Sequence, residues 1–234
     1  MIHRSAATAQ RPWPTRWSWW VPPALLALAF IPVLGGGGRL VELLGGPEVL
    51  PSDVRFAASP VPLVVHIVSA VVYAVLGAFQ FSARLRRRHP GWHRRVGRLL
   101  VVLGLAVAFS GLWMTLAYPR KDGTGDLLWV TRLLVSSGMG VAVILGLVAI
   151  RSRNIVRHRA WMTRAYALAL GAGTQAFTVG FGEALFGTGV VRTDLMMASA
   201  WAINLAIAEW IIRRPARRRT TRARRARTLL VASS

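Results

Sequence analysis

The sequence predicts an all-α integral membrane protein, a bundle of six transmembrane helices with both termini in the cytoplasm. First, 54% of its 234 residues are hydrophobic and its mean hydropathy is +0.45, more apolar than an ordinary soluble domain. Second, six apolar runs each approach the roughly 20 residues that a helix needs to cross a bilayer. Third, the basic residues gather in alternate connectors between these runs, as they do in multi-pass membrane proteins.

Each apolar run is predicted to form one helix of a membrane domain that covers residues 17–212. Connectors rich in glycine, proline or arginine separate the runs, and these residue types commonly end helices. The six runs are Trp17–Leu34, Val61–Phe81, Val96–Tyr118, Leu127–Ile150, Ala165–Phe186 and Leu195–Ile212.

The segments around the first run carry three further predictions. Residues 1–16 form a cytoplasmic arm, although basic residues before an apolar run are also compatible with a signal peptide. The tetraglycine Gly35–Gly38 is predicted to be a flexible exit from the first helix. The next residues, Arg39–Leu44, could form a short amphipathic turn in the interface.

Charge sets both the predicted orientation and the expected partners. The arm, the second-to-third connector, the fourth-to-fifth connector and the tail together hold 24 Lys and Arg, and the opposite side holds 6. The basic side is therefore predicted to be cytoplasmic. The basic tail, residues 213–234, is predicted to be disordered when free and to contact anionic lipid headgroups. Nucleic acid is a less suitable partner, because the net charge of +22 is divided among short clusters that lie between apolar runs.

Polar residues inside apolar runs are costly in a membrane, which makes them candidates for function. His66 and Gln80 lie in the second run, Arg132 near the outer end of the fourth, and Glu183 in the fifth. One interpretation is that Arg132 pairs with Glu183 or Asp194 and fixes the helix register. The other is a polar outer pocket around His66 that binds a ligand or relays protons.

Two further histidines begin helix faces made of small residues. His93 is followed by Gly97, Gly104 and Gly111, and His158 by Ala165, Ala169 and Ala172, at intervals that keep each set on one face. Such faces allow close packing of helices or the approach of a flat ligand. Without cysteine, the chain has no thiolate metal site, and no metal site is predicted.

Several of these residues carry a resemblance to a known family. His66, the motif Gly77-Ala78-Phe79-Gln80-Phe81, the run from His93 to Arg98, and the run from His158 to Arg164 resemble the bacterial predicted membrane proteins called domain of unknown function 2306. The resemblance covers about residues 62–210. It implies a multi-pass protein of the bacterial inner membrane and supplies no activity.

A weaker resemblance is to the ascorbate-reducible transmembrane b-type cytochromes, in which four central helices carry haem-ligating histidines. This chain has no histidine in its fourth run, which leaves only His93 and His158 as a pair for one haem b. With that haem, Arg94, Arg159 and Arg164 are candidate contacts to its propionates, or otherwise to lipid.

Three functions remain open at this stage. The first is electron transfer with one haem, the second is transport of a small molecule or ion through the pocket around His66, and the third is a non-catalytic scaffold or assembly factor. The sequence has no nucleotide-binding, nucleophile or zinc-protease motif, so neither an enzymatic activity nor a catalytic residue is assigned.

The distribution of basic residues makes the topology testable. We expect a reporter fused after Arg227 to behave as cytoplasmic and one inserted near Gly123 as external, because the 24 basic residues should stay inside. Paired reporters, one active only inside and one only outside, check both positions. The opposite result at either position would refute six crossings.

Overall fold

The structure, a computed structural model, describes residues 19–47, 53–56 and 59–231, and this part of the chain is helical throughout, without a β-strand. The elements in chain order are α1 (Val21–Leu43), the 3-10 turn η1 (Val54–Phe56), α2 (Val61–Gln80), α3 (Ala83–Arg88), α4 (Pro90–Ala117), α5 (Asp126–Arg151), α6 (Ile155–Ala169), α7 (Gly171–Phe186) and α8 (Val190–Val231). The all-α prediction is confirmed.

Five helices of the described chain are long and apolar enough to cross a bilayer: α1, α2, α4, α5 and the first part of α8, Val190–Arg214. Large apolar side chains such as Phe109, Trp113 and Leu134 remain exposed on the outside of the bundle. Exposing so much apolar area to water is unfavourable, so a surface of this kind lies against lipid. The chain is therefore a multi-pass membrane protein.

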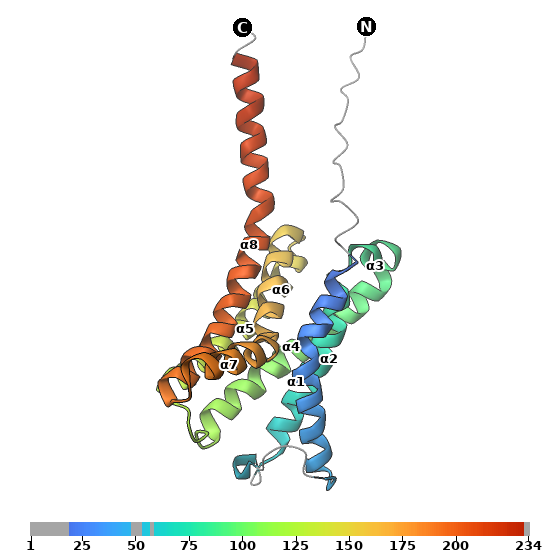
Figure 1. Cartoon of the computed structure of the whole chain (residues 1–234). Helices are drawn as coiled ribbons and strands as arrows, with labels where there is room; N and C mark the ends of the chain where they lie inside the picture. Colours follow the sequence, from blue (N-terminus) through green and yellow to red (C-terminus); the bar gives the residue numbers. More distant parts are fainter. Residues whose placement is uncertain (1–18, 48–52, 57–58, 232–234) are drawn as a thin grey trace.

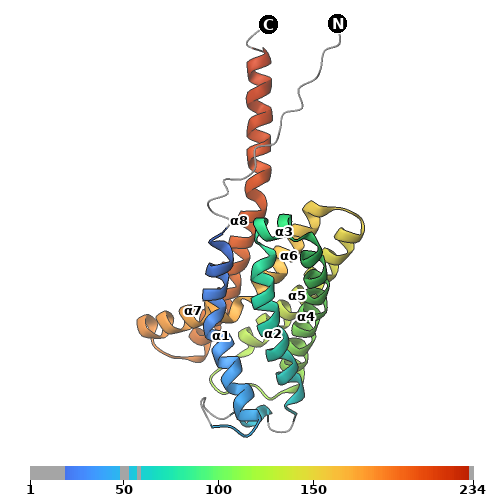
Figure 2. The ribbon, with the colours of Figure 1, turned by 90° about the vertical axis from the view of Figure 1, so that its right-hand side faces the viewer.

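The predicted fifth span, Ala165–Phe186, is not one helix. It is broken at Leu170 between α6, of 15 residues, and α7, of 16 residues, and each is shorter than a single crossing requires. Figures 1 and 2 show α7 lying across the long axis of the bundle, whereas α6 runs along it. The described chain therefore has five helices long and apolar enough to cross a bilayer, and the prediction of six regular spans is not confirmed.

Polar side chains of α8 form hydrogen bonds with backbone carbonyl groups at this break. The Ala167 carbonyl accepts a hydrogen bond from Asn204 Nδ2 at 3.1 Å, and the Leu168 carbonyl accepts one from Trp201 Nε1 at 3.2 Å. On the other side of the break, the Thr174 hydroxyl donates to Asn204 Oδ1 at 2.8 Å. No water is available in the bilayer core to replace such partners, so these contacts make the break tolerable there.

The break also depends on two glycines. A Cβ on Gly171 would overlap the Trp201 indole, and a Cβ on Gly173 would overlap the backbone carbonyl of Leu28 in α1. Small residues let helices approach this closely in membranes. Gly171 thus allows α8 to pack closely against the break, and Gly173 allows α1 to do the same.

The bundle has two ends, which we name from the predicted topology. The inner end contains the start of α1, α3 and the α5–α6 connector, and α8 extends beyond it; the outer end contains η1 and the α4–α5 connector (Figure 1). The start of α1 and the end of α8 lie at the same end, as the predicted topology requires. That this end faces the cytoplasm stays a prediction.

The N-terminal helix differs from its prediction. It begins at Val21, later than the predicted Trp17, and continues through Gly35–Gly38 to Leu43. Glycine weakens isolated helices, but here the segment packs closely against α2. A Cβ on Gly36 would lie 2.9 Å from the Ile67 side chain of α2, so the absence of a side chain allows this close contact. The predicted interfacial turn is the last part of this helix, where Arg39 pairs with Glu42 at 2.7 Å. The predicted arm, residues 1–16, lies outside the described residues.

The C-terminal end also differs from expectation. The backbone of α8 continues as helix to Val231, where the sequence indicated a disordered tail. Arginine and alanine, which dominate this segment, are among the better helix formers. The predicted contacts of the tail with anionic lipid stay a prediction.

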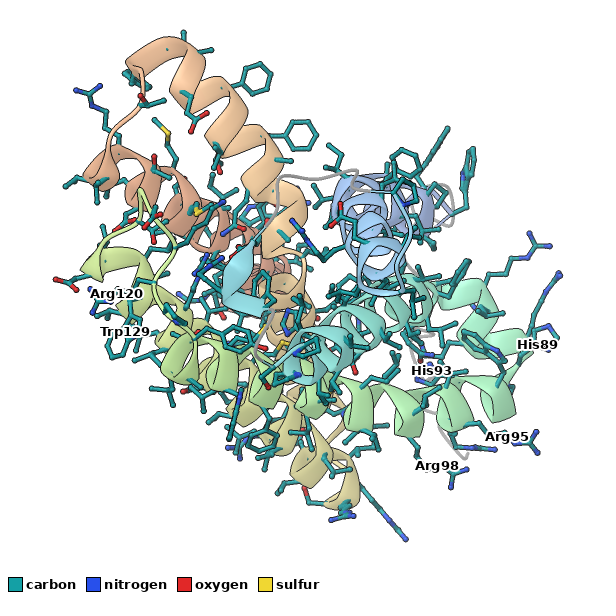
Figure 3. The ribbon with its side chains drawn as sticks, turned by 90° about the horizontal axis from the view of Figure 1, so that it is seen from below. His89, His93, Arg95, Arg98, Arg120 and Trp129 are labelled. Carbon is teal, nitrogen blue, oxygen red and sulfur yellow. The ribbon has the colours of Figure 1, made fainter. Side chains whose placement is uncertain are left out.

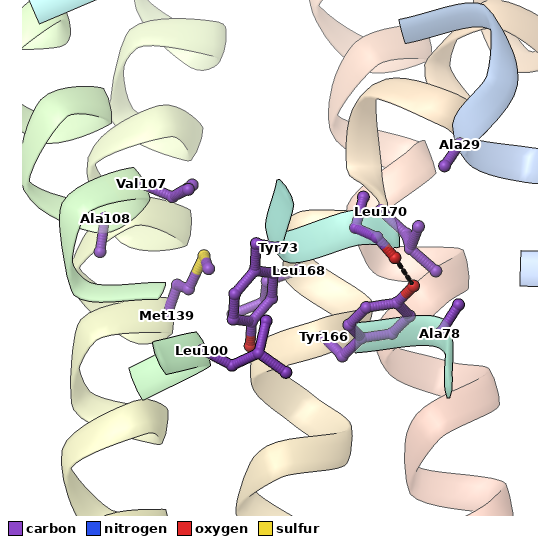
Figure 4. Close-up of a cluster of buried hydrophobic side chains, with 11 residues drawn as sticks. Ala29, Tyr73, Ala78, Leu100, Val107, Ala108, Met139, Tyr166, Leu168 and Leu170 are labelled. Carbon is purple, nitrogen blue, oxygen red and sulfur yellow. Dashed lines mark hydrogen bonds between the residues drawn. The ribbon is translucent and has the colours of Figure 1, made fainter. Parts of the chain in front are cut away.

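An aromatic core fills the middle of the bundle (Figure 4). Tyr73 and Tyr166 pack with ring centroids 5.9 Å apart, and the Tyr166 hydroxyl donates to the Ala74 carbonyl at 2.6 Å. Their rings lie against Gly104 and Gly77, where a Cβ would overlap them. This aromatic core, Tyr73 with Tyr166, closes the space between the outer and inner ends.

Two glycines of α7 allow a matched test of the break. We expect Gly173→Ala to lower the free energy of unfolding by about 1–3 kcal/mol, because the added methyl group must push α1 away from α7. Gly180 has nothing within 4 Å of the position of a Cβ, so Gly180→Ala should be neutral or slightly stabilising. Thermal unfolding in detergent micelles measures both, and equal effects would contradict the close approach.

Candidate functional site

A partly open cavity of about 400 Å³ lies between the middle and the outer end of the bundle. Its size is within the range of small-molecule binding sites. Most of its walls are apolar and come from α1, α2, α4, α5 and the residues around the break. They include Ala29, Val33, Ile67, Ala70, Val107, Val135, Met139, Leu168 and Leu170. Polar groups are few, so each one bears on what the cavity can hold. We call it the outer cavity.

Positive charge gathers where the outer cavity meets the outer end. Arg55, Tyr118 and Arg132 line the cavity and also a small depression of about 30 Å³, to which Arg120 and Lys121 contribute. The Tyr118 hydroxyl donates to the Ser59 carbonyl and ties α4 to the segment before α2. An anion approaching from this end would meet a favourable potential before it reached the cavity.

Two of these four cations have counter-charges. Arg55 pairs with Asp53 through bonds of 2.5 and 2.7 Å, and Arg120 pairs with Asp126. The hydrogen bond from Arg55 keeps the pKa of the Asp53 carboxyl below its usual value, against the opposing effect of burial. Asp53 is therefore ionised at neutral pH and neutralises Arg55.

Arg132 has no counter-charge in the described chain and, unlike the exposed Lys121, is withdrawn from solvent. It is half-buried in the cavity wall, and the described part of the chain gives it no hydrogen bond and no ion pair. Its predicted partner Glu183 is exposed on α7, so the predicted pair of Arg132 and Glu183 is not formed. A guanidinium withdrawn from water without a counter-charge is costly, and an anionic ligand would remove that cost.

Asp194, the alternative partner, is used elsewhere. Its carboxylate is buried and accepts hydrogen bonds from the backbone N–H of Gly125, at 3.0 and 3.1 Å, and of Leu128, at 3.0 Å. These groups belong to the first turn of α5, which otherwise lacks acceptors, and the carboxylate also complements the helix dipole. Asp194 thus fixes the α5 N-terminus against α8 and acts on Arg132 only from a distance.

His66 supplies a second polar group in the outer cavity. Its Nδ1 lies 3.0 Å from Ser110 Oγ, and the Ser110 hydroxyl lies 2.6 Å from the Ala106 carbonyl. A hydroxyl has one proton, which Ser110 donates to that carbonyl, so Ser110 accepts from His66 Nδ1–H. The wall around His66 is mostly apolar and no carboxylate of the described chain bonds it, so the imidazole is neutral, and its Nε2 keeps a lone pair that makes no hydrogen bond within the described chain. Besides Arg132, for which the described residues supply no counter-charge, the cavity thus offers His66 as a hydrogen-bond acceptor.

The predicted polar group of His66, Gln80, Arg132 and Glu183 is thus only half assembled. His66 and Arg132 line the same cavity. Gln80 lies at the inner end of α2, 14 residues and about 21 Å along the helix from His66. Sequence reasoning missed Ser110, which bonds His66 from 44 residues later in the chain, and also Arg55 and Trp201, which line the same cavity.

The histidines proposed to hold haem lie at the inner end. His158 Nδ1–H donates to the Gly146 carbonyl at 2.8 Å, and His93 is close enough to His158 for their charged forms to repel. In Figure 3, His93 lies against the bundle, whereas the exposed Arg95 points away from it. Of the predicted propionate contacts, Arg94 and Arg159 are exposed and Arg164 is bonded to Glu209 at 2.5 Å.

The small-residue faces above these histidines are filled by protein. A Cβ on Gly104 would lie 2.9 Å from the Tyr73 ring and 3.1 Å from Val143. Ala165 is fully buried in a cluster with Val143 and Trp161. The residues present therefore do not fit a macrocycle along these faces. Ligation of haem by His93 and His158 stays a prediction that this packing does not favour.

Comparison with known proteins adds a family. The family model described as "Predicted membrane protein (DUF2306)" matches residues 63–212, which is more than half of the chain. No curated protein and no solved structure matches. The matched region contains His66, Arg132, His93 and His158.

The hydrogen-bond direction at His66 is testable. We expect nitrogen NMR of histidine-labelled protein to show His66 neutral with its proton on Nδ1, because Ser110 is its acceptor. Ser110→Ala removes that acceptor and should shift the tautomer toward Nε2–H, with a loss of about 1 kcal/mol in unfolding free energy. A spectrum that does not change in Ser110→Ala would contradict the assignment.

Proposed function

The chain belongs to the family of predicted membrane proteins DUF2306, and from that premise we propose that it is a small-molecule transporter whose outer cavity binds an amphipathic anion. The cell membrane that we propose for it is the bacterial inner membrane, crossed with both termini in the cytoplasm. The observation that carries the proposal is Arg132, a half-buried guanidinium that faces a ligand-sized cavity without a counter-charge in the described chain.

The cavity walls specify the rest of the ligand. An anionic head would pair with Arg132 near the outer end, and an apolar body would lie along Val107, Val135 and Leu168. His66 Nε2 accepts hydrogen bonds, so it favours a ligand that also has an O–H or N–H group. A carboxylic acid with a short apolar chain and a hydroxyl group has this combination of features.

The broken helix supports movement of the ligand across the membrane. Membrane transporters commonly bind substrates near the bilayer midplane beside discontinuous helices. Here Leu170 at the break and Ala172 of α7 line the cavity. The aromatic core, Tyr73 with Tyr166, lies on the inner side of the cavity, so in the transport that we propose the site would be reached from the outer end.

Electron transfer with one haem is the second candidate, and one observation favours it. The bond from His158 Nδ1–H to the Gly146 carbonyl leaves Nε2 available, as in histidines that ligate metals. A visible spectrum of protein made with ample haem, with and without dithionite, tests this candidate. A Soret band lost in both His93→Ala and His158→Ala would support it.

A matched pair of ligands tests the outer cavity. Purified protein in lipid nanodiscs should bind decanoate more tightly than decanol, which has the same chain without the charge. We expect Arg132→Gln to weaken decanoate binding about tenfold to a hundredfold, as loss of a hydrogen bond to a charged group implies, and to leave decanol unaffected. Arg192→Gln is the control, because Arg192 is exposed and lies outside the cavity walls.

Uptake into proteoliposomes then separates transport from binding alone. We expect labelled decanoate to accumulate faster with wild-type protein and Arg192→Gln than with Arg132→Gln or empty liposomes. Binding without accelerated uptake would refute transport and leave a ligand-binding protein. Equal decanoate affinity of wild type and Arg132→Gln would refute the anion site itself.

A further inference from the structure

A second group of polar residues lies at the inner end, on the opposite side of the aromatic core from the outer cavity. Its members come from four helices, α2, α3, α4 and α6. They are Gln80, Arg86, His93, His158 and Arg159, and we call them the inner basic cluster. Arg86 is close enough to Arg159 and to His93 for electrostatic repulsion, and His93 to His158. The fold thus gathers like charges from segments far apart in the sequence.

Two buried atoms of this cluster lack hydrogen-bond partners. Within the described chain, Gln80 Nε2 and His93 Nδ1 are both buried, and neither has a partner. Buried polar atoms are nearly always bonded in folded proteins, so each such atom indicates a missing group. The amide Nε2 can only donate, which means that the missing group carries an acceptor.

No carboxylate of the described inner end neutralises the cluster. Glu209 is the nearest candidate by its place in α8, but Arg164 holds it at 2.5 Å and Arg213 at 3.1 Å. Burial, Arg159 and Arg87 together lower the pKa of the Arg86 guanidinium. An anion would therefore suit this position better than a water molecule.

The cluster also has room beside it. Gly97 lies one turn after His93 on α4, and nothing lies within 4 Å of the position that its Cβ would occupy. Farther along the same helix, Gly104 and Gly111 face close neighbours instead. The open position is therefore confined to the turn nearest the cluster.

We propose that the inner basic cluster binds a phosphate group, either of an anionic phospholipid or of a soluble phosphate compound. Phosphate oxygens would accept from the Arg86 guanidinium, from Gln80 Nε2 and from His93, which supplies the donors that several oxygens on one anion require. The site is independent of the outer cavity and of the transport that we propose for it.

Topology alone does not account for the cluster. Arg95 and Arg98 also add to the positive charge of the inner end, but both are exposed and point away from the bundle (Figure 3). Arg86 instead reaches back over the end of α2, where it donates to the Gln80 backbone carbonyl at 3.2 Å. Its position beside two unpartnered atoms distinguishes it from a charge that serves orientation alone.

Variants of the cluster and of the exposed arginines form a matched set. Arg86→Gln removes the cation, and Gln80→Leu removes the unpartnered amide without leaving a cavity, so the second variant should fold at least as well as wild type. Arg95→Gln is the control. Thermal unfolding of the full chain in micelles is measured with dihexanoyl phosphatidylglycerol, with dihexanoyl phosphatidylcholine and with inorganic phosphate.

We expect phosphatidylglycerol or phosphate to stabilise wild type and Arg95→Gln, and the half-saturating concentration to rise about tenfold in Arg86→Gln and Gln80→Leu. Stabilisation by phosphatidylglycerol but not by phosphate identifies a lipid headgroup, and the reverse identifies a soluble compound. No stabilisation by either, stabilisation by phosphatidylcholine alone, or equal loss in Arg95→Gln would overturn the site.

Discussion

A polar group inside a bilayer must find its partner within the protein or on a ligand, because no water is present to supply one. The break at Leu170 shows how this protein meets that constraint. Asn204 and Trp201 of α8 bond the carbonyls at the end of α6, and Gly171 lets the indole come close enough to do so. Because the break redirects α7 across the bundle, residues from both sides of it can line the outer cavity.

The same constraint distinguishes structural polar residues from candidates for function. Asp194 is buried, yet its oxygens are occupied by the first turn of α5, and His66 Nδ1 is occupied by Ser110. Arg132 in the outer cavity has no such partner in the described chain, nor do Gln80 Nε2 and His93 Nδ1 at the inner end. Polar groups without a partner in the described chain therefore lie in the outer cavity and at the inner end, with the aromatic core between these two places.

Hydropathy predicted the all-α fold and its long apolar helices, since each span is a local property of the chain. The break within Ala165–Phe186 could not be predicted in that way, because its stability comes from α8, some 30 residues later. The sequence singled out His66 and Arg132, which line one cavity, because charge and imidazole are conspicuous in apolar runs. It could not show that Asp194 would cap α5, or that Tyr73 would fill the face of Gly104, because both depend on how helices pack.

The central claim is that an anion completes the environment of Arg132. An experimental density map of the protein purified in native lipid, at a resolution that shows side chains, tests this most directly. We predict elongated density in the outer cavity that ends within hydrogen-bond distance of the Arg132 guanidinium. An empty cavity in which Arg132 instead forms an ion pair with Asp194 or Glu183 would contradict the account.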